Sequence, residues 1–291
     1  MEPSIDECGL EMIIRKIEKH GFDCRQLRPS YLQRRLLIRM HATRSRNCLE
    51  YWRLLNKDPE EYSRLLDKLT VNLTEFFRDT EVFKFIANNL APELISRKVK
   101  HKQSLIRAWN AGCATGEEAY SIAMILHRAI AHRSERLTIS VTGTDLDQNA
   151  IAHAKLGRYE QRCLKQCSSE IVERYLKRYL IDYGDYLEVS PVIKSLVKFK
   201  QLDLFAEEPI KMVDIIFCRN VMIYFSKSQQ ERLQSVLCNS LLKNGYLILG
   251  NSERLVGEAV TLLEPVNMLL RIYQRSQERI LREGEGNEEP I

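Results

Sequence analysis

The stretch from Leu105 to Met124 (LIRAWNAGCATGEEAYSIAM) constrains the fold more than any other part of the chain. An apolar run around Trp109 leads into small residues from 111 to 116, and apolar residues at helical spacing follow from Tyr120. A buried strand that enters a glycine-containing turn and opens a helix is typical of the nucleotide-binding corner of a doubly wound α/β fold. Glycine lets a ligand approach the backbone closely because it has no Cβ.

The helix of this corner opens with Glu117 and Glu118, and two acids at this point argue against a phosphate ligand. A phosphate site uses the positive end of the helix dipole, which these carboxylates would neutralise. They favour a cationic ligand, and S-adenosylmethionine is one, with its sulfonium and amino groups. The alternative is that both glutamates complement the helix dipole and face solvent.

Length and composition exclude several classes of protein. With 291 residues and 44% hydrophobic content, the chain can form a sizeable core, most simply in two domains. No apolar run approaches the roughly 18 residues of a membrane span, so we expect no membrane insertion. The first ten residues show no secretory signal, and the eight scattered cysteines and six histidines show no disulfide framework or metal-ligand spacing. We therefore expect a cytoplasmic protein with reduced cysteines and no metal site.

Residues 1–70 are predicted to form an all-helical N-terminal domain, because apolar residues recur at helical spacing from Leu10 to Ile17. Between Arg25 and Arg46 there are seven arginines and no acid. Arg35 and Arg39 lie four residues apart, on one face of an amphipathic helix. Such a basic face could dock on an acidic protein or a nucleic acid, and the alternative is an ordinary solvated face.

The segment 70–79 (TVNLTEFFRD) is predicted to begin a helix before Glu75, with Asn72 or Thr74 as its cap. Arg78 is the residue of interest here, although a single arginine in such a helix is usually a surface residue. Four aromatic residues of this region are expected in the core: Phe76, Phe77, Phe83 and Phe85.

Further strands are expected at 137–145, 197–202, 213–220 and 246–250. Asp145 ends the first of them, where a carboxylate can accept hydrogen bonds from both hydroxyls of a ribose. Alternatively, Asp145 or Asp147 caps the following helix, and the two roles can fall one to each aspartate.

The strand 213–220 is nearly continuous in apolar residues and therefore central and parallel. It ends in Arg219 and Asn220, with Tyr224 shortly after, and ligands of open parallel sheets bind at the carboxyl ends of strands. Residues 157–195 break the alternation of strands and helices and are expected to form a small β excursion.

The C-terminal part is predicted to contain a helix from Ser228 to Gly245, with Glu231 completing a capping box. Residues 260–263 and 268–273 are expected to form a closing antiparallel pair. The charged tail from residue 276 is expected to be disordered.

Taken together, these stretches resemble the chemotaxis receptor methyltransferases of the CheR family. The resemblance covers about residues 10–275 in the family's order, through the strings NLTEFFRD, AGCATGEEAYSIAM, TGTDLD, GRYE, DIIFCRNVMIYF and LILGNSE. It implies a helical N-terminal domain (1–70) and an α/β class I S-adenosylmethionine-dependent methyltransferase domain, Rossmann-like (71–275), with a small antiparallel β subdomain (about 157–195). A charged tail (276–291) follows. The implied reaction transfers the methyl of S-adenosylmethionine to glutamate side chains of chemoreceptor cytoplasmic helices and leaves S-adenosylhomocysteine.

The resemblance also assigns roles to individual residues. It implies that Arg78 and Tyr224 lie nearest the transferred methyl, and that the segment around Arg35 and Arg39 docks on the receptor. The implied cofactor contacts are Asn72, Thr74, Arg78, Glu118, Asp145, Asp203, Leu204, Arg219 and Asn220. We expect Arg78 and Tyr224 to orient the attacking carboxylate, Glu118 to hold the cofactor's amino group and Asp145 its ribose.

Two departures from the family pattern matter. Asp203 stands where the family often has Asn, which keeps an acceptor and loses a donor. The segment 179–184 (YLIDYG) lacks the several glycines found where some members bind a receptor's C-terminal pentapeptide. We therefore expect no such tether.

Two alternatives follow from the sequence. A nucleic-acid methyltransferase usually carries an Asn/Asp-Pro-Pro-aromatic string after the fourth strand, but residues 219–222 read RNVM, so we expect no nucleic-acid partner. A catalytically silent adaptor that senses S-adenosylmethionine, or a methyltransferase of another acidic protein, is the second alternative. We expect a monomer.

Overall fold

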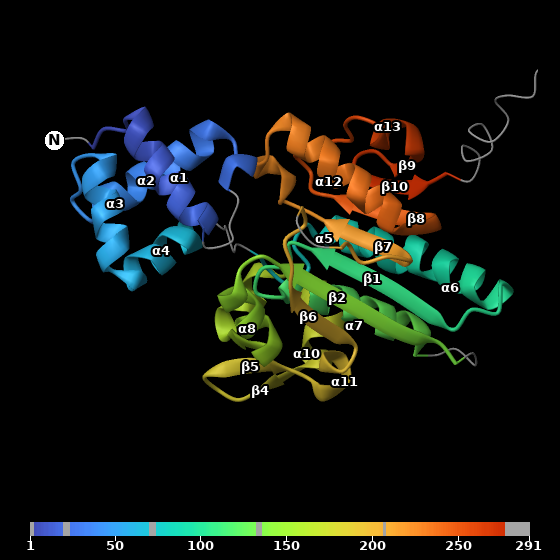
Figure 1. Ribbon diagram of the computed structural model, residues 1–291. Helices are drawn as coiled ribbons and strands as arrows, with labels where there is room; N and C mark the ends of the chain where they lie inside the picture. The colour runs from blue at the N-terminus through green and yellow to red at the C-terminus, as the bar shows by residue number, and fades with distance from the viewer. Residues whose placement is uncertain (1–2, 20–23, 70–73, 132–135, 206–207, 277–291) are drawn as a thin grey trace, which may run out of the picture. The chain divides into compact units, whose positions relative to one another are not determined.

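The computed structural model describes residues 3–19, 24–69, 74–131, 136–205 and 208–276. Asn72 and the tail beyond residue 276 lie outside the described residues. The chain divides into two compact units (Figure 1). The first, called here the helical unit, comprises Met1–Asn72 and Ile223–Gln230, and the second, the sheet unit, comprises Leu73–Met222 and Glu231–Ile291. Within the described ranges, no helix is long and apolar enough to cross a membrane.

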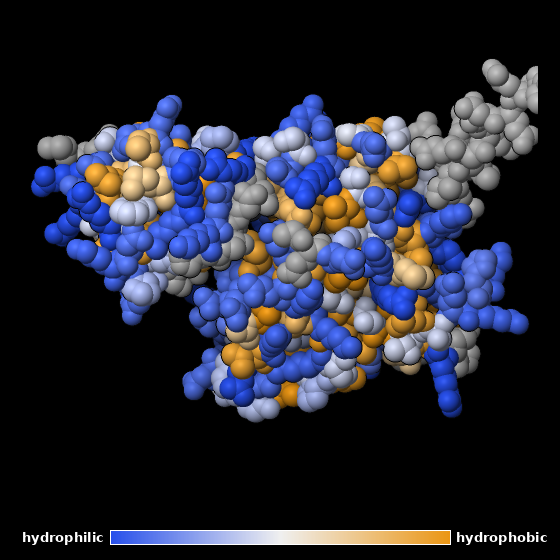
Figure 2. All heavy atoms as spheres, viewed as in Figure 1, coloured by the Kyte–Doolittle hydropathy of each residue, from blue (hydrophilic) through white to orange (hydrophobic). Residues whose placement is uncertain are grey.

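The helical unit packs short amphipathic helices around one apolar core. Its elements are α1 (Glu7–Lys19), the 3₁₀ turn η1 (Cys24–Gln26), α2 (Pro29–Ala42), α3 (Cys48–Lys57) and α4 (Pro59–Leu69). Ile13, Ile17 and Leu36 are fully buried in that core. Figure 2 shows that hydrophilic residues cover most of the visible surface of this unit, interrupted by a few apolar ones.

Residues 223–230 belong to the helical unit although they lie far from it in the sequence. The ring of Tyr224 lies 4.9 Å from that of Tyr31, measured between centroids, and the backbone N–H of Arg28 donates to the Tyr224 carbonyl at 2.9 Å. Leu27 and Phe225 form an isolated antiparallel bridge. Tyr224 is thus held by the helical unit, a grouping that no local sequence pattern indicated.

The larger sheet of the sheet unit has seven strands within the described residues. Five parallel strands come first, in the order β6 (Val197–Gln201), β2 (Thr138–Asp145), β1 (Leu105–Ala111), β7 (Val213–Cys218) and β8 (Leu241–Leu249). The antiparallel strands β10 (Ile272–Arg275) and β9 (Leu263–Asn267) complete the sheet. The strand order reverses between β1 and β7, which makes their carboxyl ends the topological switch point where such folds bind ligands.

Helices flank this sheet, and the strands of a second, smaller sheet come between β2 and β6 in the sequence. The helices include α5 (Thr80–Phe85), which continues through a π-helical turn η2 (Ile86–Leu90) into α6 (Ala91–Lys100), then α7 (Glu117–Ile130), α8 (Gln148–Leu156) and α12 (Lys227–Ser240). α6 and α7 run beside β1 and contact it (Figure 1). Short strands β3 (Arg158–Glu160), β4 (Leu180–Asp182) and β5 (Tyr186–Val189) form an antiparallel sheet in the order β3-β5-β4. The predicted fold class is confirmed.

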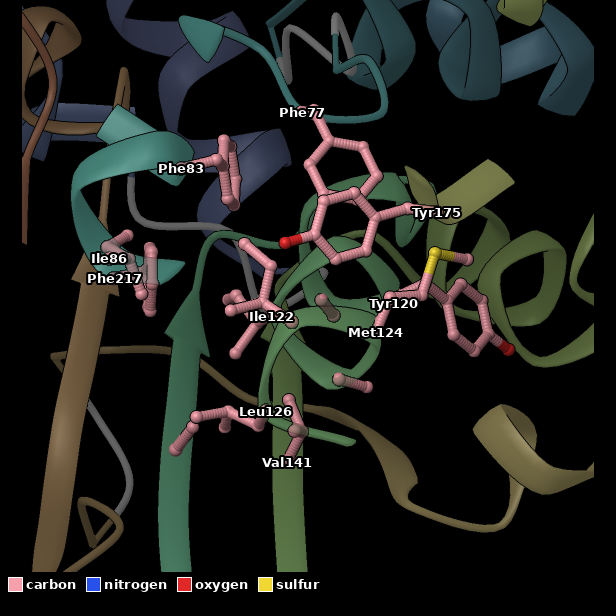
Figure 3. Close-up of a cluster of buried hydrophobic side chains, with 14 of the residues drawn as sticks. Phe77, Phe83, Ile86, Tyr120, Ile122, Met124, Leu126, Val141, Tyr175 and Phe217 are labelled. Atoms are coloured by element: carbon pink, nitrogen blue, oxygen red, sulfur yellow. The ribbon is translucent and has the colours of Figure 1, made fainter. Parts of the chain in front are cut away.

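The core of the sheet unit joins the loop before α5 to α7 and the central strands. All six residues of β7 are buried, as expected for a central strand. Phe77 and Phe83 point toward Tyr175 and Phe217 in one aromatic cluster (Figure 3), and the Phe77 and Tyr175 ring centroids lie 4.9 Å apart. The prediction that Phe76, Phe77 and Phe83 are core residues is confirmed, while Phe85 is only half-buried.

Several predicted element boundaries are wrong. The helix expected before Glu75 begins at Thr80, because Phe77 and Asp79 adopt left-handed φ angles of 53° and 59°. The helix expected to end at Gly245 ends at Ser240, and Gly245 lies inside β8. A Cβ on Gly245 would lie 2.9 Å from the Leu242 carbonyl oxygen, so this glycine serves close backbone packing.

The cap and the closing pair also differ from expectation. Ser226 Oγ, not Ser228, accepts a hydrogen bond from the N–H of Gln229 at the start of α12. Residues 260–263 fall mostly in a short helix, α13 (Ala259–Leu262), so the closing antiparallel pair consists of β9 and β10 instead.

Candidate active site

The turn after β1 lies at the switch point and contains two glycines. Gly112 and Gly116 adopt φ angles of +77° and +96°, which few residues with a side chain adopt. A Cβ on Gly112 would collide with Cγ2 of Val221, and one on Gly116 would lie 2.8 Å from Cβ of Ala154. The Gly112 N–H donates to the Thr144 carbonyl at 2.8 Å, which joins the turn to the end of β2.

Asp145 ends β2 beside this turn. Its Oδ2 accepts from the N–H of Ala114 at 2.8 Å, and its Oδ1 accepts from the N–H of Asp147 at 3.0 Å. Burial raises the pKa of Asp145, and these backbone donors oppose the rise. Asp147 caps α8 by accepting from the N–H of Asn149 at 2.7 Å, so the capping role falls to Asp147 and leaves Asp145 at the site.

Asp203 and Leu204 follow β6 and are half-buried. The N–H of Leu202 donates to the Asp145 carbonyl at 2.9 Å, so the end of β6 lies next to the end of β2. Asp203 Oδ1 accepts from the N–H of Phe205 at 2.8 Å, which fixes the carboxylate at the start of the loop. The structure therefore brings Asp203 to the same edge of the sheet as Asp145.

Glu118 and Arg219 form a buried ion pair across the switch point. Arg219 Nη1 lies 2.5 Å from Glu118 Oε2, and Asn110 Nδ2 donates to Glu118 Oε1 at 2.9 Å. Only 7% of the Glu118 surface is exposed, so the alternative in which both glutamates face solvent is wrong for this residue. Asn110 Oδ1 and Arg219 Nε are buried and form no hydrogen bond within the described part of the chain.

Arg219 also fixes the loop that carries Arg78. Its Nη1 donates to the carbonyl of Arg78 at 3.1 Å, and its Nη2 pairs with Asp79. The N–H of Phe77 donates to Ser121 Oγ of α7 at 3.0 Å. Arg78 itself is half-buried. These contacts hold two left-handed residues, Phe77 and Asp79, in a conformation that costs about 1–3 kcal/mol each.

Glu117 lies beside Glu118 but has a different environment. Thr115 Oγ1 donates to its Oε2 at 2.7 Å. Burial raises the pKa of Glu117 to about 7, which the Thr115 hydrogen bond only partly opposes. The Glu117 carboxyl therefore changes its protonation state near neutral pH.

Asn220 continues the chain from Arg219 in a left-handed conformation, with φ of 60°. Its N–H donates to the buried carboxylate of Glu253 at 3.1 Å. Sequence reasoning did not select Glu253 as a site residue. The only sequence signal was an acid in the string LILGNSE, just after the end of a strand.

The expectation that Arg39 belongs to an uncompensated basic face is wrong. Arg39 forms two hydrogen bonds with Glu61 of α4, from Nε to Oε1 at 3.0 Å and from Nη2 to Oε2 at 2.5 Å. Tyr51 OH also donates to Glu61, at 2.8 Å. Arg35 instead lies over the ring of Tyr31, with its guanidinium carbon 5.0 Å from the ring centroid.

The predicted site residues thus fall into three groups. The sheet unit brings Arg78, Glu118, Asp145, Asp203, Leu204, Arg219 and Asn220 to the carboxyl edge of its parallel strands. Tyr224, Arg35 and Arg39 belong to the helical unit. Thr74 lies five residues before Asp79 and is half-buried, whereas Asn72 is outside the described residues.

Comparison with known proteins gives matches over nearly the whole chain. Residues 72–269 match the family model described as CheR methyltransferase, SAM binding domain, and residues 9–70 match the CheR methyltransferase all-alpha domain. A chemotaxis protein methyltransferase of Borreliella burgdorferi is 31% identical over 241 residues, which cover 81% of this chain and 84% of that protein. Chemotaxis protein methyltransferase 2 of Pseudomonas aeruginosa is 31% identical over 238 residues, 81% of this chain and 82% of that protein.

Proposed function

The chain belongs to the CheR methyltransferase family, and we propose that it methylates glutamate side chains on chemoreceptor cytoplasmic helices, with S-adenosylmethionine as methyl donor. One observation carries the proposal. The glycine turn, the buried Glu118–Arg219 pair and the Asp145 carboxylate meet where β1, β2 and β7 end. That edge is where open α/β sheets bind their ligands.

Several features of this edge fit S-adenosylmethionine. Gly112 and Gly116 give the turn left-handed φ angles and let it pack tightly against Val221 and Ala154, which sets the course of the backbone beside the proposed cofactor site. The buried Asn110 Oδ1, which accepts no hydrogen bond from the described residues, is available to the cofactor's amino group together with Glu118. The carboxylate of Asp145 accepts backbone N–H groups through both oxygens and keeps acceptor capacity for a ribose hydroxyl. When bound, the cofactor supplies a methyl group on a positively charged sulfur.

The chain's task in the reaction is positioning. A receptor glutamate, with a pKa of about 4.3, is already ionised at neutral pH and needs no general base. With the cofactor bound, such a carboxylate oxygen could take the methyl group directly, and sulfur would keep the electron pair of the broken carbon–sulfur bond. We assign to the Arg78 guanidinium and the Tyr224 hydroxyl the role of orienting that carboxylate. The hydrogen bond from Arg219 to the Arg78 carbonyl supports this role by fixing the Arg78 backbone.

The role of Arg78 is tested by Arg78→Ala and Arg78→Lys. Loss of a positioned charge at a reacting centre should lower turnover about 100-fold in the alanine variant, and lysine should restore part of it. Titration with S-adenosylmethionine separates a substrate role from a cofactor role, since only the latter changes affinity. Wild-type turnover and affinity in Arg78→Ala would refute the assignment.

For receptor docking we propose the basic surface of α2 and the turn after it. Arg39 is occupied by Glu61, so it supports this surface from within. Arg35 is half-buried, and Arg34, Arg44 and Arg46 are exposed. Exposed guanidinium groups can attract acidic receptor helices and speed their encounter.

We further propose that the protein acts as a cytoplasmic monomer and without a pentapeptide tether. The β4–β5 turn contains one glycine, Gly184, and the rings of Tyr183 and Tyr186 stack across it with centroids 5.1 Å apart. Gln161 Nε2 donates to Asp182 at 2.7 Å. The turn thus has two stacked tyrosines and a single glycine where tethered members have several glycines. Tight calorimetric binding of a receptor-tail pentapeptide would overturn the tether proposal.

The function itself is tested with radiolabelled S-adenosylmethionine and a chemoreceptor cytoplasmic fragment. Carboxyl methyl esters hydrolyse in base and release labelled methanol. We expect such release with the fragment and none when its methyl-accepting glutamates are replaced by alanine. Cofactor binding without transfer to any receptor would favour a silent adaptor or another acidic substrate.

A further inference from the structure

Glu253 is a buried carboxylate that accepts hydrogen bonds from the loop after β7. It lies just after β8 and is 4% exposed. Its Oε1 accepts from the N–H groups of Val221 and Met222 at 2.9 and 2.8 Å. Its Oε2 accepts from the N–H groups of Asn220 and Gly250 at 3.1 and 2.6 Å. Four backbone donors therefore converge on one side chain.

These hydrogen bonds determine the shape of residues 219–222. Three consecutive N–H groups converge on this one carboxylate, an arrangement that an extended strand does not provide. Asn220 takes a left-handed φ of 60° to achieve it. A Cβ on Gly250 would lie 2.9 Å from both the Asn220 nitrogen and Glu253 Oε2, so the turn after β8 is packed directly against this loop. Without the carboxylate, the three N–H groups would lose the acceptor that they share.

The loop that Glu253 holds is part of the cofactor corner. Arg219 opens the loop and pairs with Glu118 and Asp79. Val221 packs against the backbone of Gly112, so closely that any Cβ at Gly112 would collide with it. A shift of this loop would therefore move the guanidinium of Arg219 and uncover the glycine turn at the same time.

We propose that Glu253 is a positioning residue for S-adenosylmethionine binding, which fixes residues 219–222 so that Arg219 reaches Glu118 and Val221 closes on the glycine turn. Glu253 acts through the loop and makes no contact with substrate. The inference rests on the cofactor-binding part of the proposed function and is independent of the identity of the methyl acceptor.

The test compares Glu253→Gln with a matched control, Asp214→Asn. Glutamine keeps the size of the side chain but replaces one acceptor oxygen with an NH2 group, which donates hydrogen bonds and cannot accept the two N–H groups that the oxygen accepts. Asp214 is also a buried carboxylate, and it lies near the start of β7, the strand that leads into the loop. It accepts from the N–H of Arg107 at 2.9 Å and pairs with Lys98 at 2.7 Å. Its loss should weaken the fold without touching the loop.

Three quantities are measured on each full-length variant: affinity for S-adenosylmethionine by calorimetry, amide hydrogen exchange of residues 219–222, and stability in urea. We expect Glu253→Gln to weaken cofactor binding about tenfold or more, the scale of losing a hydrogen bond to a charged group. Exchange of the 220–222 amides should accelerate. Asp214→Asn should leave affinity within about twofold and these amides protected, even at equal loss of stability. Glu253→Asp, which keeps the charge, should bind more tightly than the glutamine variant.

Wild-type affinity and protected amides in Glu253→Gln would overturn the inference. An equal loss of affinity in Asp214→Asn would also overturn it, because Glu253 would then matter only for stability. If both the glutamine and the aspartate variant failed to fold, Glu253 would be a folding residue and the inference would fall. If the wild-type protein did not bind S-adenosylmethionine, both the proposed function and this inference would be refuted.

Discussion

At the scale of single residues, Arg219 joins the parts of the site. Its side chain is 1% exposed and pairs with two carboxylates from segments 39 residues apart, Asp79 and Glu118. Removal of the Arg219 charge is costly, because the buried carboxylate of Glu118 cannot recover its hydration. Arg219 therefore holds the loop of Arg78 against α7.

We predict that Arg219→Met lowers the free energy of unfolding by about 3 kcal/mol, the scale of breaking one side of a buried ion pair. The double variant Arg219→Met/Glu118→Gln should recover part of that loss, since it leaves no uncompensated charge at position 118. Urea unfolding of the wild type, both single variants and the double variant measures the coupling. Additive effects would show that the pair does not act as a unit.

Glu117 gives a prediction for pH. Its pKa rises from 4.5 to about 7 on burial, so the folded protein holds this proton more tightly than the unfolded chain does. The resulting stabilisation is fully present below pH 4.5 and is lost as pH rises through about 7, and it amounts to at most about 3 kcal/mol. Glu117→Gln should remove this slope from urea unfolding measured between pH 5 and 8. An unchanged slope in the variant would contradict the prediction.

Sequence patterns found the residues whose role depends on local position. Glu118 and Asp145 could be selected because one opens a helix after a glycine turn and the other ends a strand. Arg39 was misjudged because its partner, Glu61, comes from another helix, and a count of charges along 25–46 does not include it. The role of Glu253 could not be predicted for the same reason, since three of its four donors lie about 30 residues earlier.

At the scale of elements, the turn between β1 and α7 is the most constrained feature. Gly112→Ala adds both a strained left-handed φ and a collision with Val221, so we predict a loss of about 2 kcal/mol or more of stability together with weaker S-adenosylmethionine binding. Gly184→Ala is the matched control, because Gly184 also has a left-handed φ, +85°, but no atom within 4 Å of its Cβ position.

The control should lose only about 1 kcal/mol to strain and keep full cofactor affinity. Thermal unfolding and calorimetric titration of the two variants measure both effects. Equal losses in the two variants would mean that backbone strain alone, and not the contact with Val221, makes Gly112 necessary.

Periodicity predicted which elements exist better than where they end. The strands β1 and β7 could be predicted from their apolar runs, because buried parallel strands are nearly continuous in apolar residues, and β2 could be predicted from its β-branched residues. The predicted end of α12 is wrong because a glycine after a helical pattern indicates a cap, but Gly245 lies inside β8. The left-handed residue nearby is Asn244, with φ of 60°. Asparagine tolerates this conformation through its short polar side chain, so glycine was a misleading signal.

At the scale of the whole molecule, the observed order of strands places the predicted site residues of the sheet unit at one edge of the sheet. The membership of Tyr224 in the helical unit could not be predicted from sequence patterns. It depends on contacts with Arg28 and Tyr31, nearly 200 residues earlier, which leave no local periodicity in either segment.

The basic surface gives a prediction for receptor docking. Reversing the exposed charges in Arg34→Glu/Arg46→Glu should lower kcat/KM for receptor methylation several-fold at low salt and leave S-adenosylmethionine affinity unchanged. The difference from wild type should shrink toward 1 M salt, where the Debye length falls to about 3 Å. Arg15→Glu is the control, because Arg15 is an exposed arginine of the same unit that already pairs with Glu11. An equal effect in the control would indicate net charge alone.

The most direct test of the account maps methyl groups on a chemoreceptor cytoplasmic fragment by mass spectrometry after incubation with S-adenosylmethionine. The wild-type chain and the Arg78→Ala variant are compared at equal cofactor saturation. We predict that the wild-type chain places methyl esters on the receptor fragment only at glutamates of its helices. The Arg78→Ala variant should place far fewer. Modification of other residue types, or no ester on any receptor glutamate despite bound cofactor, would contradict it.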